Sequence, residues 1–163
     1  MKNISVLLFL LITLALNAQN NKTSGLNARQ FHKYWKVESE SPDYKVTFLG
    51  DTVEILSPKG LTLWRKEKMS GKVTIEYDAC VVVEVEGDRL SDLNCFWMAS
   101  DPQYPDNIWK REKWRSGIFL NCYSLQLYYM GYGGNHNSTT RFRRYDGNEA
   151  AITNAKARPA ILK

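Results

Sequence analysis

Residues 123–147, YSLQLYYMGYGGNHNSTTRFRRYDG, form the stretch of sequence that decides the fold of this chain. Two strand-like runs flank a glycine-rich loop, and this pattern predicts an antiparallel hairpin. Alternate residues of a strand face the same side. In the first run we therefore predict a core face with Tyr123, Leu125, Leu127 and Tyr129, and an outward face with Ser124, Gln126, Tyr128 and Met130.

The second run of this hairpin, residues 139–145, carries three arginines. We take Phe142 as the mark of its core side, so that the residues alternating with it would face outward. The prediction places Arg141, Arg143 and Tyr145 beside Gln126 and Tyr128. Arginine binds an oxyanion with a planar fork, and aromatic rings stack on sugar rings. Such a face would bind a polysaccharide that carries carboxylates or sulfates.

A second interpretation of the same arginines stays open. Arg141 and Arg143 would pair across strands with acidic side chains of another strand-like run, forming a solvated ladder of ion pairs. The available partners are Glu76, Asp78 and Glu84.

The loop at residues 131–137, GYGGNHN, combines three glycines with reactive side chains. If the site is catalytic, these residues best support β-elimination from a uronate-containing polysaccharide. Arg141 or Arg143, with Asn135, would neutralise the carboxylate. His136 would serve as the base, and Tyr132 or Tyr128 as the acid. Hydrolysis would need two facing carboxylates, for which Glu76 and Asp78 are the candidates. We rank elimination above hydrolysis, and neither above plain binding. A structural or partner-binding sandwich without a glycan ligand stays open as a further alternative.

Further strand patterns surround this hairpin. Residues 45–56 read as a second hairpin about Gly50 and Asp51, and residues 61–65, 94–99 and 118–122 read as short strands. Residues 72–86 give the clearest signal, because every odd position from 73 to 85 is apolar. We find no helix-period segment long enough to cover a sheet. The sequence thus predicts an all-β protein, an antiparallel sandwich or jelly roll.

Residues 100–117, SDPQYPDNIWKREKWRSG, form an irregular excursion longer than an ordinary connection. Two interpretations are open for its tryptophans, Trp109 and Trp114. They would either pack down on the sheet from a short helix, or form a rim that presents indole rings to sugars.

The chain begins with a basic residue followed by an apolar run, which predicts a signal peptide over residues 1–18 and a secreted or periplasmic protein. A flexible lead-in over residues 19–34 and a single domain over residues 35–163 follow. We predict no membrane span after cleavage. The net charge is +5, without a run of five basic residues, so we expect no nucleic-acid partner.

The three cysteines, Cys80, Cys95 and Cys122, lie in apolar strand-like runs, and we expect buried thiols. A bridge between Cys95 and Cys122 remains an alternative. Their spacing fits no zinc site, so no metal or cofactor is predicted.

Three segments carry a family resemblance: residues 62–80, TLWRKEKMSGKVTIEYDAC; residues 95–102, CFWMASDP; and residues 123–147. Together they resemble a bacterial secreted family of unknown function, similar to concanavalin A-like jelly-roll proteins near polysaccharide lyases and to YesU-like proteins of rhamnogalacturonan use. The resemblance implies a two-sheet jelly roll, export, and work on plant or algal polysaccharide. Structural calcium is common in that fold, but no ligand set for it is recognisable here. Relatives continue past residues 158–163 with further strands, so we expect a jelly roll that lacks its last strands and is marginally stable.

Overall fold

The computed structural model describes residues 27–50, 52–84, 86–88 and 93–150. The predicted signal peptide lies outside these residues, and so does the segment after residue 150. Within the described residues no helix is long and apolar enough to cross a membrane.

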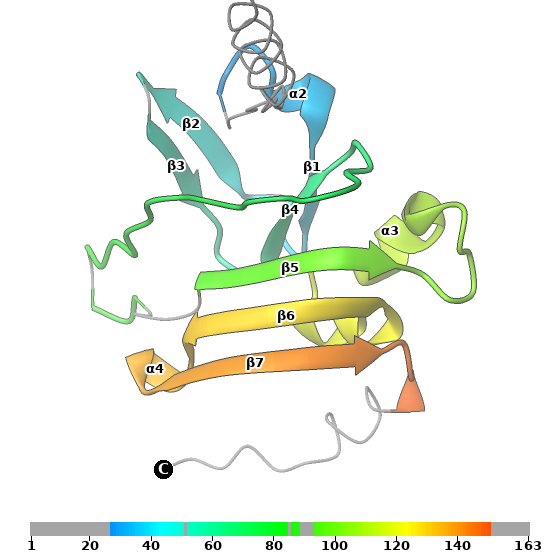
Figure 1. Ribbon diagram of the computed structural model, residues 1–163. Helices are drawn as coiled ribbons and strands as arrows, with labels where there is room; N and C mark the ends of the chain where they lie inside the picture. Colours follow the sequence, from blue (N-terminus) through cyan, green and yellow to red (C-terminus); the bar gives the residue numbers. More distant parts are fainter. Residues whose placement is uncertain (1–26, 51, 85, 89–92, 151–163) are drawn as a thin grey trace, which may run out of the picture.

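The described chain is built from short antiparallel strands with a few single-turn helices, which confirms the predicted all-β class. The jelly-roll order of strands stays a prediction. Figure 1 shows the strands in three groups. The bounds are β1 (Trp35–Ser39), β2 (Lys45–Leu49), β3 (Thr52–Leu56), β4 (Leu61–Arg65), β5 (Leu93–Ser100), β6 (Gln126–Gly133) and β7 (Thr139–Asp146).

The sheets pair β1 with β4, β2 with β3, and β5 with β6 and β7, in that order. The β2–β3 hairpin is the one predicted from residues 45–56, and Gly50 adopts the positive φ of 60° that its tight turn needs. The β6–β7 hairpin is the one predicted from residues 123–147. The other pairings join segments far apart in the chain.

The helices are α2 (Phe31–Tyr34), η1 (Ile108–Arg111), α3 (Glu112–Arg115), η2 (Phe119–Ser124) and α4 (Gly134–Asn137). The sequence predicts a strand at residues 118–122, and this prediction is wrong, because those residues lie largely in the 3-10 helix η2. The core lies between η2 and one face of the β5–β6–β7 sheet. Its buried members are Trp64, Cys122, Leu125, Leu127, Tyr129 and Tyr145.

The strand predicted at residues 72–86 is also wrong over its described part. Residues 72–84 run as an extended coil between β4 and β5 (Figure 1) without strand pairing. Val73, Ile75 and Tyr77 stay 47%, 47% and 57% exposed. Period-two alternation reports which side chains could share a face, whereas a strand also requires a neighbour for its backbone groups. The acidic residues of this coil make no ion pair with Arg141 or Arg143 among the described residues, so the predicted ladder is not formed there.

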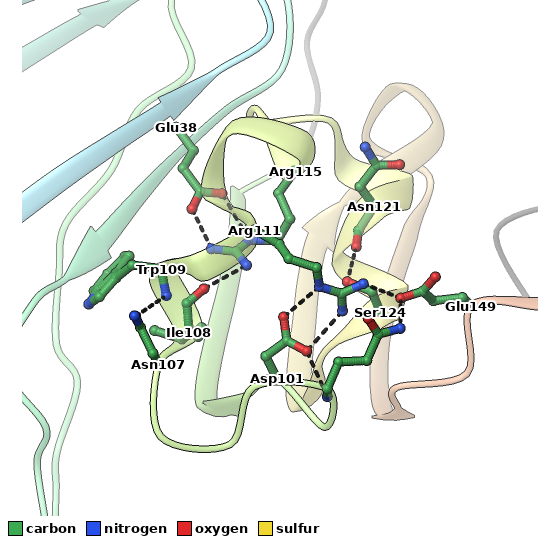
Figure 2. A network of polar contacts seen from close by, with 11 residues as sticks. Glu38, Asp101, Asn107, Ile108, Trp109, Arg111, Arg115, Asn121, Ser124 and Glu149 are labelled. Atoms are coloured by element: carbon green, nitrogen blue, oxygen red, sulfur yellow. Dashed lines mark hydrogen bonds and ion pairs between the residues drawn. The ribbon is translucent and has the colours of Figure 1, made fainter.

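Buried ion pairs anchor the excursion between β5 and β6 (Figure 2). Arg115, fully buried, donates from Nη2 to Glu38 Oε1 at 2.6 Å and from Nε to Glu38 Oε2 at 3.1 Å. Arg111 donates to both oxygens of buried Asp101, at 2.8 and 2.9 Å, and also pairs with Glu149. The first pair joins α3 to β1, and the second joins η1 to the end of β5 and to the segment after β7. The excursion is therefore a fixed part of the fold.

Candidate functional site

The β5–β6–β7 sheet has an inner face against η2 and an opposite side, here called the outer face. Residues directly opposite one another in paired strands point to the same side. The register aligns Trp97 with Tyr128 and Tyr128 with Arg144, so these three form one row across the outer face. The next row towards the β6–β7 loop holds Cys95, Met130 and Phe142. The preceding row holds Ser100, Gln126 and Asp146.

Three aromatic rings of the outer face are in mutual contact, and we call Trp97, Tyr128 and Phe142 the aromatic platform. The ring centroids of Trp97 and Tyr128 are 5.9 Å apart, those of Tyr128 and Phe142 are 6.1 Å apart, and those of Trp97 and Phe142 are 5.6 Å apart. Two of these pairs are stacked, with interplanar angles of 21° and 24°. Phe142 is 66% exposed. The outer face therefore carries a cluster of three aromatic rings, in which Phe142 is exposed and Trp97 and Tyr128 are half-buried.

Polar side chains border this platform at its β7 side. Arg144 is exposed and lies directly opposite Tyr128. Gln126 and Asp146 lie opposite each other in the neighbouring row, and Asp146 Oδ1 accepts a hydrogen bond from the Asn148 amide at 3.0 Å. Arg144, Asp146, Tyr123 and Tyr145 line an open depression of about 530 Å³ at the edge of β7. Arg144 makes no ion pair or side-chain hydrogen bond within the described residues.

The predicted faces are confirmed for β6 and wrong for β7. Leu127 and Tyr129 are buried as predicted, but the register places Tyr145 opposite Leu127 and Arg143 opposite Tyr129, on the inner face. Tyr145 is only 6% exposed, whereas Phe142 is the exposed residue. The prediction that Arg141, Arg143 and Tyr145 face outward beside Gln126 and Tyr128 is therefore incorrect.

Tyr145 is a core residue. Its ring lies 4.5 Å from that of Tyr123 and is stacked at 5.7 Å on that of Tyr129, centroid to centroid. Burial, reinforced by the neighbouring Tyr123 hydroxyl, raises the pKa of Tyr145 far above its usual value. Arg143 is half-buried beside this cluster and donates from Nη1 to the Tyr123 hydroxyl at 3.4 Å. Arg141 lies opposite Gly131 on the same face and is exposed.

The β6–β7 loop has an unusual backbone. Asn135, His136 and Asn137 all have positive φ, at 53°, 58° and 61°. Asparagine and histidine tolerate this left-handed region better than most residues. Ser138 Oγ donates to the Asn135 carbonyl at 2.7 Å, and Asn135 Nδ2 donates to Thr139 Oγ1 at 3.3 Å. The loop is thus a defined turn at the end of the hairpin, with His136 exposed on it.

The structure distributes the candidate catalytic residues over separate places. Tyr128 and Tyr132 lie on β6, with Tyr128 in the platform and Tyr132 56% exposed near the loop. His136 and Asn135 lie on the turn, and Arg141 lies on the inner face. Within the described residues no group of three or more His, Cys, Asp or Glu side chains could hold a metal ion.

The two tryptophans of the excursion behave differently. Trp109, in η1, packs against the core, and Lys36 Nζ lies 5.3 Å from its ring centroid. This confirms the packing interpretation for Trp109. Trp114, in α3, is 44% exposed, and the Arg111 guanidinium lies 5.1 Å from its ring centroid. Trp114 therefore keeps an accessible face, but it lies on α3 and not on the β5–β6–β7 sheet that carries the aromatic platform.

The cysteines are all free in the described chain. Cys122 is buried in the core, and burial raises the pKa of its thiol to about 12. Cys95 lies on the outer face, on the other side of the sheet, which prevents a Cys95–Cys122 bridge. The expectation of buried thiols is wrong for Cys80, which is exposed.

Sequence reasoning missed Trp97, Phe142 and Arg144 as site residues. Trp97 falls in the run NCFWMA, where Phe96 and Trp97 alternate and neither is marked as the outward one. A left-handed Met98, at φ 54°, accompanies the register shift between Trp97 and Ser100. No local pattern in the sequence announces that shift. Phe142 and Arg144 can be assigned to the outer face only when the register of the β6–β7 hairpin is known.

Comparison with known proteins finds no matching curated protein and no matching solved structure. One family does match, over residues 55–162, more than half of the chain. That range includes the whole β5–β6–β7 sheet and therefore the aromatic platform. The predicted membership in a family of unknown function is confirmed. The chain belongs to the family described as a domain of unknown function (DUF6250).

Proposed function

We propose that this protein binds a polysaccharide through the outer face of its β5–β6–β7 sheet, without cleaving it there. The observation that carries this proposal is the aromatic platform of Trp97, Tyr128 and Phe142. The face of an aromatic ring is electron-rich and attracts the C–H groups on the apolar side of a sugar ring. A ring triplet on a sheet also needs little reordering when a ligand binds, because its side chains are held by neighbouring strands.

The arrangement of the polar groups favours binding over β-elimination. Elimination at Tyr128 would require a cation beside it to neutralise the carboxylate and a base on the same side of the sugar. Arg141 and Arg143, the cations predicted for that role, lie on the opposite side of the sheet. Arg144 does lie beside Tyr128, but the predicted base, His136, lies on the β6–β7 turn and not in the row of Tyr128. The groups proposed for elimination therefore do not share one face. Binding requires only the platform and its polar border.

The resemblance to concanavalin A-like and YesU-like proteins is in keeping with this proposal. On that basis we propose a jelly-roll fold of that type, and an exported protein that meets polysaccharide outside the cytoplasm. The positive net charge of +5 favours an encounter with acidic polymers over neutral ones.

The proposal is tested by affinity electrophoresis of the full chain in gels that contain single plant or algal polysaccharides. We expect at least one polymer to retard the protein, and Phe142→Ala to weaken that binding about tenfold, since one aromatic contact is lost. Tyr44→Ala, which removes an exposed aromatic ring from the β1–β2 connection, is the matched control and should bind like the wild type. Equal retardation of wild type and Phe142→Ala in every binding gel would refute the proposal.

A further inference from the structure

We propose that Arg144 makes the aromatic platform selective for hexuronate residues, by binding the sugar carboxylate while the sugar ring stacks on Tyr128 and Phe142. This inference rests on the proposed function and adds the chemical class of the ligand. Arg144 lies directly opposite Tyr128 on the outer face. On β7 it is two residues from Phe142, on the same side of the sheet. Arg144 is exposed, so its side chain is accessible beside the platform.

The position suits the geometry of a uronate. The carboxylate of a hexuronate is attached at the rim of the sugar ring, so a ring lying on the platform directs this group sideways. A depression of about 530 Å³ opens at the edge of β7, where this carboxylate would lie; Arg144 and Asp146 line it together with the core-side residues Tyr123 and Tyr145. The planar fork of arginine binds a carboxylate with two parallel hydrogen bonds, which sets its orientation as well as its energy.

The charges near Arg144 leave it available for a ligand. The acidic side chain nearest in register is Asp146, which faces the same side, and its Oδ1 already accepts the Asn148 amide hydrogen. Gln126, opposite Asp146, is neutral and offers donors and acceptors for sugar hydroxyls. Within the described residues no ion pair joins Arg144 to either Asp146 or another acid. The other two arginines of β7 cannot replace it, because Arg141 and Arg143 are on the inner face.

The test compares each acidic polymer with its own carboxyl-reduced form, which keeps the backbone and removes the charge. Polygalacturonate and alginate are the probes, and affinity is measured for the full chain at low and high salt. We expect tighter binding of the acidic forms. Arg144→Gln should lower their affinity about tenfold and leave the reduced forms unaffected, because a charge-assisted bond is lost. Arg144→Lys should fall between the two, since it keeps the charge without the fork.

Arg141→Gln is the matched control, because it removes the same charge from the same strand on the opposite face. The inference is overturned if Arg144→Gln binds the acidic polymers like the wild type, or if Arg141→Gln loses as much affinity. It is also overturned if the wild type binds acidic and reduced forms equally, even when Phe142→Ala weakens both and the platform is thereby upheld. If Phe142→Ala binds the carboxyl-reduced polymers as tightly as the wild type does, the aromatic platform is not the binding surface. That result would refute the proposed function, whatever the affinity of Arg144→Gln.

Discussion

Phe142 and Tyr145 show which face of β7 is buried and which is exposed. Both are aromatic, three positions apart on one strand, and the strand can bury only one of them against the sheet core. Hydrophobicity favours Phe142 as the buried residue, yet the structure buries Tyr145 at 6% exposure and leaves Phe142 at 66%. The tyrosine fits because two further tyrosine rings, Tyr123 and Tyr129, pack around it. The buried position is thus set by aromatic packing more than by polarity.

Gly131 is important for packing because it has no side chain. The ring of Tyr129 leans along β6 over Gly131, and its hydroxyl donates to Asn94 Oδ1 at 2.9 Å. A β-carbon at residue 131 would overlap the Tyr129 hydroxyl and the ring carbon that bears it. The absence of a side chain at Gly131 therefore makes room for a core tyrosine.

We predict that Gly131→Ala lowers the free energy of unfolding by about 3 kcal/mol, because Tyr129 must leave its position in an overpacked core. Urea unfolding measures this loss. Gly50→Ala is the control: Gly50 has φ 60° and open space around it, so that substitution costs only backbone strain, about 1 kcal/mol. If both variants lose the same free energy of unfolding, the position of the Tyr129 ring does not require a glycine at residue 131.

At the scale of elements, the sequence predicted the local hairpins and missed the placement of their faces. The β2–β3 and β6–β7 hairpins follow from alternation and turn residues, which are local signals. The face of β7 depends on the register across a loop that contains three consecutive left-handed residues, Asn135, His136 and Asn137. A shift of one residue in that loop moves every side chain of the strand to the other face. No motif in residues 131–137 specifies how many residues lie in the loop between the two strands.

The excursion between β5 and β6 is held as an element by charges that the sequence does not mark as paired. Arg111 and Asp101 are ten residues apart, and Glu149 comes from beyond β7. Burial would raise the pKa of Asp101, but its hydrogen bonds from Arg111 and from the Gln103 amide outweigh this effect and lower the pKa below its ordinary value. The ionised carboxylate is therefore the form that the folded protein stabilises.

We predict that Asp101→Asn destabilises the protein by about 3 kcal/mol at pH 7, because Arg111 keeps its charge in a largely buried position with one partner fewer. The contribution of Asp101 is complete above the pKa of the unfolded chain, about 3.9. It is lost as the pH falls through the lower pKa of the folded protein. The difference between wild type and variant should therefore stay constant from pH 7 to pH 5 and shrink towards pH 3.

Urea unfolding at pH 7, 5 and 3 tests this dependence. Asp43→Asn serves as the control, because Asp43 is exposed and forms no ion pair among the described residues. A stability difference for Asp101→Asn that is unchanged at pH 3, or no larger than that for Asp43→Asn, would contradict the assigned role of the Arg111–Asp101 pair.

At the scale of the whole molecule, composition and periodicity were sufficient for the all-β class but not for the pairing of strands. The described strands form three small sheets, and β1–β4 and β5–β6 join segments separated by many residues. Residues 72–84 show the limit most clearly. Their alternation is the strongest strand signal in the chain, yet they have no strand neighbour in the described structure. Periodicity specifies faces, whereas pairing depends on what the rest of the chain supplies.

One surface of the molecule carries the proposed function, the outer face of the β5–β6–β7 sheet. Five tryptophans are distributed over the chain, and they report on different places. Trp97 belongs to the aromatic platform, Trp64 is buried in the core, and Trp114 is exposed on α3. Their indole N–H groups give separate NMR signals, which single Trp→Phe variants assign.

The most direct measurement is therefore an NMR titration of the isotope-labelled full chain with oligogalacturonate and with a neutral oligosaccharide. We predict that the indole signal of Trp97 shifts with increasing ligand, while the signals of Trp64 and Trp114 stay in place. A shift of Trp114 with Trp97 unchanged would move the binding surface to the excursion between β5 and β6. Saturation of binding with no shift at Trp97 would contradict the central claim that the outer face binds sugar.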